Sequence, residues 1–234
     1  MSNVIATQRK VLTREADEQT DEPQKANDQF RKMLVRAKVL DGPVGSAYIE
    51  MGNTKVMCSV NGPKEQQSGD YSHEGSLNVS IYGIDSTNVR YTIQSSLNAV
   101  VCLKKLAKAK VDVELNVLAD DGGLVAACLM VAGVALISAS IECFDLVLAC
   151  NLLLYDSGTQ TILDPTQSQL KKHTKGVNVT IGIMPALGQV VCCDVNGLVR
   201  KNVLDKALDY GFRKCLEVYP LMSEVLRSKD GNLF

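Results

Sequence analysis

The residues with the best spacing for chemistry are Asp121, Gly122 and Gly123, which lie where a predicted strand gives way to a predicted helix. A Gly-Gly turn at a helix start suits a phosphate group, because free backbone N–H groups and the helix dipole both point there. A working phosphate site usually adds a hydroxyl and a fixed cation. The next residues are Leu124 and Val125, both aliphatic. The sequence therefore predicts the shape of an anion site without its side chains, or, alternatively, two glycines that only allow close packing of helix and strand.

The sequence contains no motif for metal binding, redox chemistry or nucleophilic catalysis. The chain holds two histidines, His73 and His173, and its eight cysteines form no CxxC pair. The spacing of a zinc site is therefore absent, and no nearby base points to a cysteine nucleophile. We expect no metal, no cofactor and reduced, mostly buried thiols. The cysteines are Cys58, Cys102, Cys128, Cys143, Cys150, Cys192, Cys193 and Cys215.

A compact basic group is the main candidate for contacts with nucleic acid. It consists of Lys104, Lys105, Lys108 and Lys110, which could meet phosphates as a solvated patch. The alternative is an ordinary helix C-terminus with favourable cations. The net charge of −1 excludes a general attraction for nucleic acid, and the absence of tryptophan argues against sequence-specific reading of RNA bases.

Two acidic residues in apolar surroundings are expected to be structural. Asp145 interrupts a hydrophobic stretch, where a carboxylate is more often satisfied by hydrogen bonds than catalytic. The run Asp164-Pro165-Thr166 is expected to fix a turn and to cap a short helix.

The chain divides into two parts. Residues 1–28 are polar and acidic with little hydrophobic periodicity, so we expect a tail that is disordered or is ordered only by a partner. Residues 29–234 are expected to form one domain. The longest uncharged stretch, residues 124–141, is closely followed by Glu142 and Asp145 and fits a buried core helix better than a membrane span. No secretory signal and no membrane association are expected.

Hydrophobic periodicity predicts an α+β domain with a strand-rich first third. The Gly52-Asn53 step predicts a tight hairpin, and Gly62-Pro63 is expected to end the strand that follows. Strands are expected at 33–40, 45–51, 55–60, 76–82, 111–118, 144–155, 161–163, 177–183 and 189–195. Helices are expected at 88–108, 124–140 and 202–227, with a short one within 164–174.

Six segments occur in order along the chain: Gly45-Ser46-Ala47, Gly52-Asn53-Thr54-Lys55-Val56, Gly62-Pro63-Lys64-Glu65, Asp121-Gly122-Gly123, Phe144-Asp145-Leu146-Val147 and Leu163-Asp164-Pro165-Thr166. Together they resemble the RNase PH family, whose fold combines mixed sheets with core helices and is like domain 2 of ribosomal protein S5. The last of them, 163–166, together with 183–190 and 215–220, resembles the ring subunits of the eukaryotic RNA exosome, in particular the mRNA-transport-regulator type.

The resemblance implies a lost catalytic site, with no catalytic residue to name. Phosphorolytic members place Thr or Ser and then Arg after the two glycines, where this chain has Leu124 and Val125. They carry an Asp where this chain has Asn178, which cannot exchange a proton usefully near neutral pH. Upstream acidic residues of the family correspond here to Gln167, Ser168 and Gln169.

The resemblance also implies partners. We expect a non-catalytic subunit that lies beside other RNase PH-like ring subunits and S1/KH cap subunits and takes part in 3′→5′ RNA processing and decay. Single-stranded RNA would pass through the ring channel, with Arg90 the nearest match to the channel arginines of the family. The expected locations are nucleus, nucleolus and cytoplasm. Two alternatives stay open: an active phosphate-dependent 3′→5′ exoribonuclease, and an unrelated small-molecule enzyme on the same broad architecture.

Overall fold

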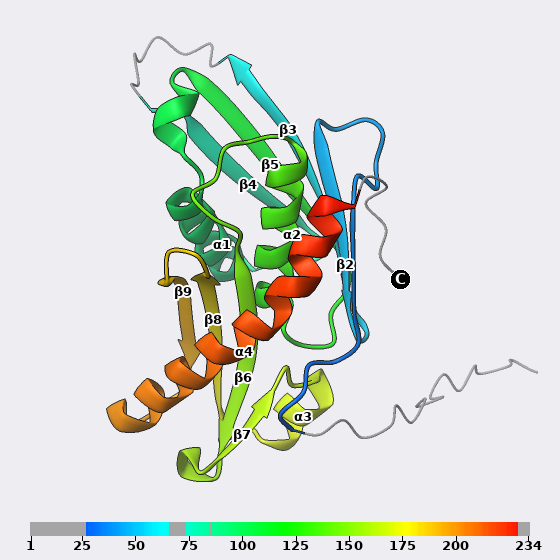
Figure 1. Cartoon of the computed structure of the whole chain (residues 1–234). Helices are drawn as coiled ribbons and strands as arrows, with labels where there is room; N and C mark the ends of the chain where they lie inside the picture. Colours follow the sequence, from blue (N-terminus) through cyan, green and yellow to red (C-terminus); the bar gives the residue numbers. More distant parts are fainter. Residues whose placement is uncertain (1–26, 66–73, 85, 229–234) are drawn as a thin grey trace, which may run out of the picture.

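The computed structural model describes residues 27–65, 74–84 and 86–228, which form two β-sheets and the helices packed between and over them (Figure 1). The first sheet has the strand order β1-β2-β3-β5-β4, and the second has the order β7-β6-β8-β9. The first comprises β1 (Met33–Ala37), β2 (Gly45–Met51), β3 (Thr54–Glu65), β4 (Ser76–Tyr82) and β5 (Ala109–Ala119). The second comprises β6 (Leu148–Tyr155), β7 (Gln160–Leu163), β8 (Val177–Met184) and β9 (Gln189–Asn196).

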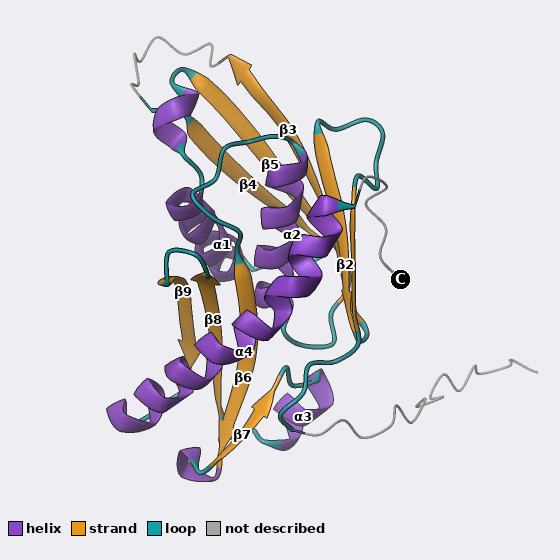
Figure 2. Ribbon diagram, viewed as in Figure 1, coloured by secondary structure: helices purple, strands orange, loops and turns teal. Residues whose placement is uncertain are grey.

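Four α-helices and two short 3₁₀ helices complete the described fold (Figure 2). Helix α2 lies between the sheets and contacts strands of both, while α4 packs across β6 and β8 and reaches β1 (Figure 1). The α-helices are α1 (Thr87–Val100), α2 (Leu124–Ser138), α3 (Gln167–Lys172) and α4 (Lys201–Arg227). The 3₁₀ helices are η1 (Leu103–Leu106) and η2 (Asp156–Gly158). The predicted α+β class is confirmed.

The first sheet is built on the predicted hairpin. Met51 pairs with Thr54, and Gly52 takes a positive φ of 56°, which glycine adopts without steric cost. The prediction that Gly62-Pro63 ends the next strand was wrong, since β3 continues to Glu65. A register shift between Asn61 and Lys64 accommodates the proline there, because the ladder is interrupted where proline lacks its N–H.

Helix α1 is shorter than its periodicity predicted. It ends at Val100, and the backbone then pairs with a segment far along the chain. The Cys102 N–H donates to Glu142 O at 2.9 Å, and the Phe144 N–H donates to Val100 O at 2.8 Å. Tertiary pairing therefore overrides helix propensity after residue 100, and the expected helix over 88–108 is corrected to α1 followed by η1.

Helix α2 is apolar on all sides and buried over residues 126–136, as expected of a central helix. The second sheet receives α4 on its opposite face, where a Cβ at Gly211 would lie 2.4 Å from Ile181 Cδ1.

The strand expected over 144–155 begins only at Leu148. Asp145 holds the turn before this strand, because its Oδ2 accepts a hydrogen bond from Ala186 N at 2.6 Å. The Asp145 carboxylate therefore has the structural role that the sequence predicted.

The eight cysteines all lie in the described residues, and none is disulfide-bonded. Five are buried, and burial raises the pKa of the Cys58 and Cys128 thiols well above the usual value. Burial together with the nearby Cys102 raises the pKa of Cys143 to about 12. Most thiols are therefore buried and protonated at neutral pH, while Cys193 is exposed.

No helix in the described part of the chain is long and apolar enough to cross a membrane. The predicted tail, residues 1–28, falls outside the described residues except for its last two positions, and His73 lies outside them as well.

Candidate functional site at the start of helix α2

The Gly-Gly turn joins β5 to α2 in a left-handed conformation. Gly122 has φ 93° and Gly123 has φ 71°, and Gly123 is the N-cap of α2 without a capping side chain. A Cβ at Gly122 would lie 2.5 Å from Pro165 O, so no larger residue fits without movement of the backbone. Both glycines are therefore needed to bring the start of α2 against the Asp164–Pro165 turn, as the packing alternative predicted, although the contact is with a turn rather than with a strand.

A buried arginine fixes this turn from the N-terminal side. Arg31 is 5% exposed, and its Nε and Nη2 donate to the two oxygens of Asp164 at 2.8 and 2.6 Å. The same guanidinium donates to Asp121 O at 3.0 Å and to Gly122 O at 2.9 Å. The Arg31 backbone N–H adds a third hydrogen bond to Asp164 at 3.1 Å. The sequence did not predict this pair, because an isolated arginine before the first strand carries no periodic or motif signal.

Thr54 and α3 hold the same turn from two further directions. Thr54 Oγ1 donates to Gly122 O at 2.8 Å and accepts from Asp121 N at 3.0 Å. The backbone N–H of Gln167, at the start of α3, donates to Asp121 O at 2.9 Å. The turn is therefore anchored by β3, α3 and the segment before β1, and its geometry is rigid.

Carboxylates outnumber cations around this turn. The only guanidinium within ion-pair distance of the turn in the described chain belongs to Arg31, and it is committed to Asp164 and the turn carbonyls. The neighbouring carboxylates of Asp120, Asp121 and Asp164 outnumber it. Leu124 and Val125 are partly buried against the core and offer no polar group. Negative charge close to the first turn of α2 opposes the binding of phosphate.

Two amides lie on the face of the second sheet that approaches the start of α2. Asn151 on β6 and Asn178 on β8 lie on one face of the sheet, since Asn151 pairs with Thr180 and Asn178 pairs with Leu153. Asn151 also approaches the start of α2, with its Cβ 3.9 Å from an ideal Cβ at Gly123. Within the described residues, the Oδ1 atoms of both asparagines are buried without a hydrogen-bond partner. Neither amide can act as a general acid or base.

The polar side chains at the start of α3 cap this helix. Thr166 is the N-cap, and it forms a capping box with Gln169, as the expected short capped helix required. Gln167 and Ser168 follow at the first two helical positions, and the Ser168 hydroxyl lies 2.8 Å from Thr166 Oγ1. No cluster of three metal-binding side chains occurs in the part of the chain that the structure describes.

The predicted basic group is brought together only in part. Lys104 and Lys105 lie in η1, Lys108 follows with φ 61°, and Lys110 is the second residue of β5. The helix-end alternative holds only for Lys104 and Lys105, which lie in the last turn of η1, because α1 ends earlier and carries no basic residue in its last turn. Arg90 lies near the start of α1, about 15 Å along the helix axis from Val100, where α1 ends.

Two of the lysines already have acidic partners. Lys105 forms an ion pair with Glu142, and the hydrogen bond in this pair raises the pKa of Lys105. Lys110 Nζ lies 2.8 Å from Asp112 Oδ1, and the hydrogen bond from this lysine lowers the pKa of Asp112. The positive charge available to a phosphate backbone is therefore smaller than the number of lysines suggests.

The comparisons agree with this architecture. Residues 29–142 match the 3′ exoribonuclease family (RNase PH), domain 1. The exosome complex component MTR3 of Homo sapiens is 28% identical over 242 residues, which cover 90% of this chain and 88% of the human protein. The exosome complex component Rrp41 of Thermoplasma acidophilum is 28% identical over 218 residues, which cover 86% of each chain.

Solved structures show the same fold at low sequence identity. Rrp46 of rice (Oryza sativa) has a TM-score of 0.80 at 20% identity, with 87% of this chain and 98% of the rice chain covered. A chain of the Archaeoglobus fulgidus exosome with RNA bound to the active site has a TM-score of 0.68 at 20% identity, with 84% and 90% covered.

Residues 29–142 are thus similar to the RNase PH family, and the described chain has the fold of these solved structures. Within that family its sequence is similar to the exosome complex component MTR3, which confirms the resemblance to the mRNA-transport-regulator type of exosome subunit.

Proposed function

We propose that the chain is a non-catalytic, structural subunit of the exosome ring, where it supports 3′→5′ RNA processing and degradation by forming part of the channel for single-stranded RNA. The relatives named MTR3 and Rrp41 are exosome components, which supports the placement. The single observation that carries the non-catalytic part is the first turn of α2, where Leu124 and Val125 follow the two glycines.

The missing side chains decide the energetics of phosphate binding. Charge-assisted hydrogen bonds are worth about 1.5–3 kcal/mol each, so the loss of a bidentate arginine removes several kcal/mol of anion binding. Arg31 cannot replace it, because its donors bind Asp164 and the carbonyls of the Gly-Gly turn. The backbone N–H groups that remain face a local excess of carboxylates, so we expect no phosphorolysis.

An exposed apolar patch on the first sheet fits contact with a neighbouring subunit. Tyr82 ends β4 and is 54% exposed, and Leu118 on β5 is 56% exposed. Tyr82 pairs with Asn116, two residues before Leu118, so both side chains lie at the same end of adjacent strands. Exposed apolar groups gathered in this way are typical of an interface with another protein.

A second patch lies on the other sheet and supports a second neighbour. Phe144 is 61% exposed, and Leu187 and Val190 are each about half exposed. The turn after Phe144 is tied to the β8–β9 hairpin through Asp145, which brings Phe144 close to Leu187. We propose that the two patches contact two different RNase PH-like ring subunits, and that S1/KH cap subunits cover the ring.

The contacts with RNA are proposed for the basic residues. Lys104 is exposed and has no acidic partner among the described residues, so it is the strongest candidate of the lysine group. Arg90 is exposed near the start of α1 and is the candidate for the channel wall. Lys105, Lys108 and Lys110 would add a diffuse attraction for phosphates. As an exosome subunit the chain would reside in nucleus, nucleolus and cytoplasm.

The proposal is tested by phosphate-dependent degradation of a 3′ single-stranded RNA. The purified chain is assayed alone and with its co-purifying proteins, which are identified by mass in the same preparation. We expect no release of nucleoside diphosphates by the chain alone, and we expect RNase PH-like partners. Release that the chain sustains alone would contradict the non-catalytic assignment and would favour the phosphate-dependent exoribonuclease.

Variants at the site sharpen the test. The pair Val125→Arg and Asn178→Asp restores the two missing chemical groups. We expect the pair to stay inactive, because the carboxylates around the turn still oppose the binding of phosphate, whereas a phosphate-dependent response of the pair would mean that a conventional site merely lacked these two groups. The matched control is Val44→Arg, which adds the same charge at an exposed valine outside both apolar patches.

A further inference from the structure

A groove made of two adjoining hollows, on the side of the second sheet that carries α4, collects basic side chains that the proposed function does not use. Its wider half has a volume of about 590 Å³, lies against α4, and is lined by Lys206, Tyr210 and Arg213 together with Thr159 and Thr161. The narrower half is lined by Lys175 and Arg200. The halves share Leu154 and Gly158, so they adjoin each other at η2, and the two together are called the groove or channel below.

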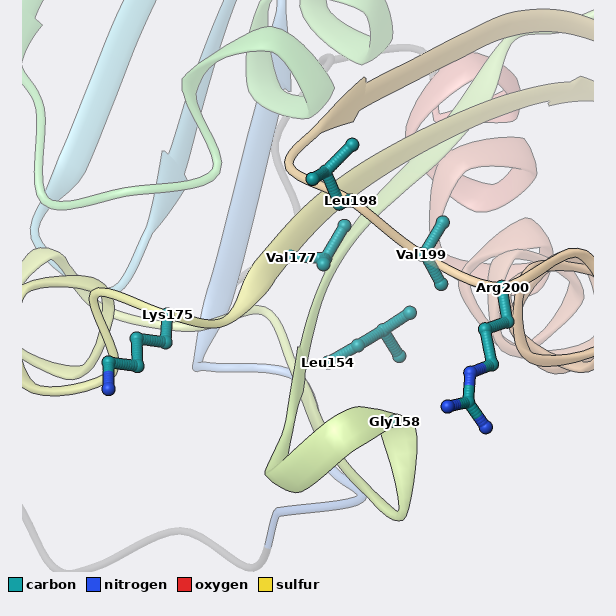
Figure 3. Close-up of a pocket in the computed structure, with 7 residues that line it drawn as sticks. All are labelled: Leu154, Gly158, Lys175, Val177, Leu198, Val199 and Arg200. Carbon is teal, nitrogen blue, oxygen red and sulfur yellow. The ribbon is translucent and has the colours of Figure 1, made fainter.

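The floor of the narrower half is apolar. Figure 3 shows Leu154, Val177, Leu198 and Val199 between Lys175 on one side and Arg200 on the other. Leu198 is 99% exposed in this structure. A groove that combines an apolar floor with cationic walls suits a peptide that carries carboxylates along an extended backbone.

The cations of the groove lack acidic partners. Lys175, Arg200, Lys206 and Arg213 form no ion pair with any carboxylate in the part of the chain that the structure describes. Arg213 Nε donates only to the backbone oxygen of Asp209, at 3.2 Å. The one acidic residue that lines the groove is Asp28, which is held by the Tyr210 hydroxyl and lies 3.1 Å from Lys214 Nζ.

The described chain begins inside this groove. Asn27 and Asp28 line its wider half, and Asn27 O accepts a hydrogen bond from Leu163 N at 2.8 Å at the free edge of β7. Asp28 is fastened to α4 through Tyr210 and Lys214. The chain before Asn27 is therefore tethered at the wider half of the groove.

The preceding sequence has the complementary charge. Residues 15–22 hold five carboxylates and no lysine or arginine. Glu22 is five residues before Asn27, and an extended chain covers that interval in about 17 Å. The groove follows α4 from Arg213 back to Arg200, about 20 Å along the helix axis. Eight extended residues span about 27 Å, so the acidic block reaches the length of the channel.

We propose that the acidic segment 15–22 of this same chain docks into the groove, as a continuation of the strap that residues 27–31 form beside β7 and α4. The tether favours this occupant over a separate acidic protein, because a short linker raises the local concentration of the segment to the millimolar range. The carboxylates face Lys206 and Arg213 near the entry and Lys175 and Arg200 at the far end. A docked acidic segment also keeps RNA from these cations.

The first test is zero-length cross-linking of carboxylates to lysines in the full chain, read by mass spectrometry. We expect links from residues 15–22 to Lys206 and Lys175, within one molecule. The control is Lys104, which is exposed on the first sheet side and is not a groove residue. Links spread equally over Lys104 and the groove lysines, or links only between molecules, would overturn the proposal.

A charge swap provides the second test, with hydrogen exchange of residues 158–163 and 203–213 as readout. Lys206→Glu with Arg213→Glu is expected to remove protection from these segments and to abolish the cross-link to Lys175, while far-UV circular dichroism is unchanged. Adding Glu18→Lys, Asp21→Lys and Glu22→Lys is expected to restore the protection. If the groove variant instead loses affinity for single-stranded RNA while neutralisation of residues 15–22 changes nothing, RNA is the occupant and the proposal is wrong.

Discussion

The buried pair of Arg31 and Asp164 is expected to dominate the stability of the site, and Asp164→Asn tests it. The carboxylate accepts three hydrogen bonds from Arg31, and the two side chains are 3% and 0% exposed. An asparagine retains the shape and tolerates the φ of 50° at this position, but it removes the charge and turns one acceptor into a donor that faces the guanidinium.

Removal of one partner from a buried ion pair costs about 3–5 kcal/mol, because the other charge stays buried without compensation. In a protein of this size each kcal/mol lowers Tm by about 2–4 °C, so the expected decrease is roughly 6–20 °C. The measurement is thermal and urea unfolding followed by circular dichroism at 222 nm (the usual far-UV helix band). The double variant Arg31→Met with Asp164→Asn is expected to recover part of the loss, since it removes the stranded charge.

The matched control is Asp112→Asn, which breaks the partly exposed pair with Lys110. Such pairs contribute about 0–1 kcal/mol, so its Tm should change little. The reasoning would be refuted if Asp164→Asn cost no more than Asp112→Asn, or if the double variant were as unstable as the sum of its two single changes.

Three further outcomes are expected. Gly122→Ala should lower the free energy of unfolding by more than the ~1–2 kcal/mol that a left-handed backbone costs a non-glycine residue, because the new Cβ would lie 2.5 Å from a carbonyl oxygen. Gly188→Ala, at φ 63° with nothing within 4 Å of the new Cβ, should cost only that conformational energy. Urea unfolding measures both losses, and equal losses would contradict the steric argument. Cys193 should be the first thiol to react with a disulfide reagent in the native chain, as timed by mass spectrometry, and simultaneous reaction of all thiols would show that the core is open. In the assembled complex, Lys104→Ala and Arg90→Ala should each lower the slope of log K against log salt by about 0.7 for single-stranded RNA, and an unchanged slope would remove that residue from the RNA path.

Much of the fold followed from local patterns. Alternation placed β8 and β9 correctly, and the all-apolar stretch after Gly123 identified the central helix. The errors occurred where pairing between distant segments decided the structure. Helix α1 gave way after Val100 because its next residues pair with 142–144, and β3 passed through Gly62-Pro63 because a register shift absorbs the proline.

The sequence pointed to the Gly-Gly turn as the candidate site, but it did not predict the contacts that hold this turn. Leu124, Val125 and Asn178 could be compared with a family pattern position by position. Arg31 could not, because its partner lies 133 residues away and neither residue belongs to a local motif that requires the other. The groove was missed for a similar reason, since Lys175 and Lys206 are brought to one channel only by the packing of α4 on the second sheet.

The separation of Arg31 and Asp164 in the sequence also determines when this ion pair can form during synthesis of the chain. The guanidinium leaves the ribosome 133 residues before its carboxylate partner, an interval of roughly 7–27 s at about 5–20 residues per second. During that time the segment before β1 lacks its anchor, and the start of α2 lacks the turn at Asp164–Pro165 against which the glycines pack. The Arg31–Asp164 pair therefore forms only after the whole first sheet and α2 have been synthesised, and until then the Gly-Gly turn lacks two of the groups that hold it.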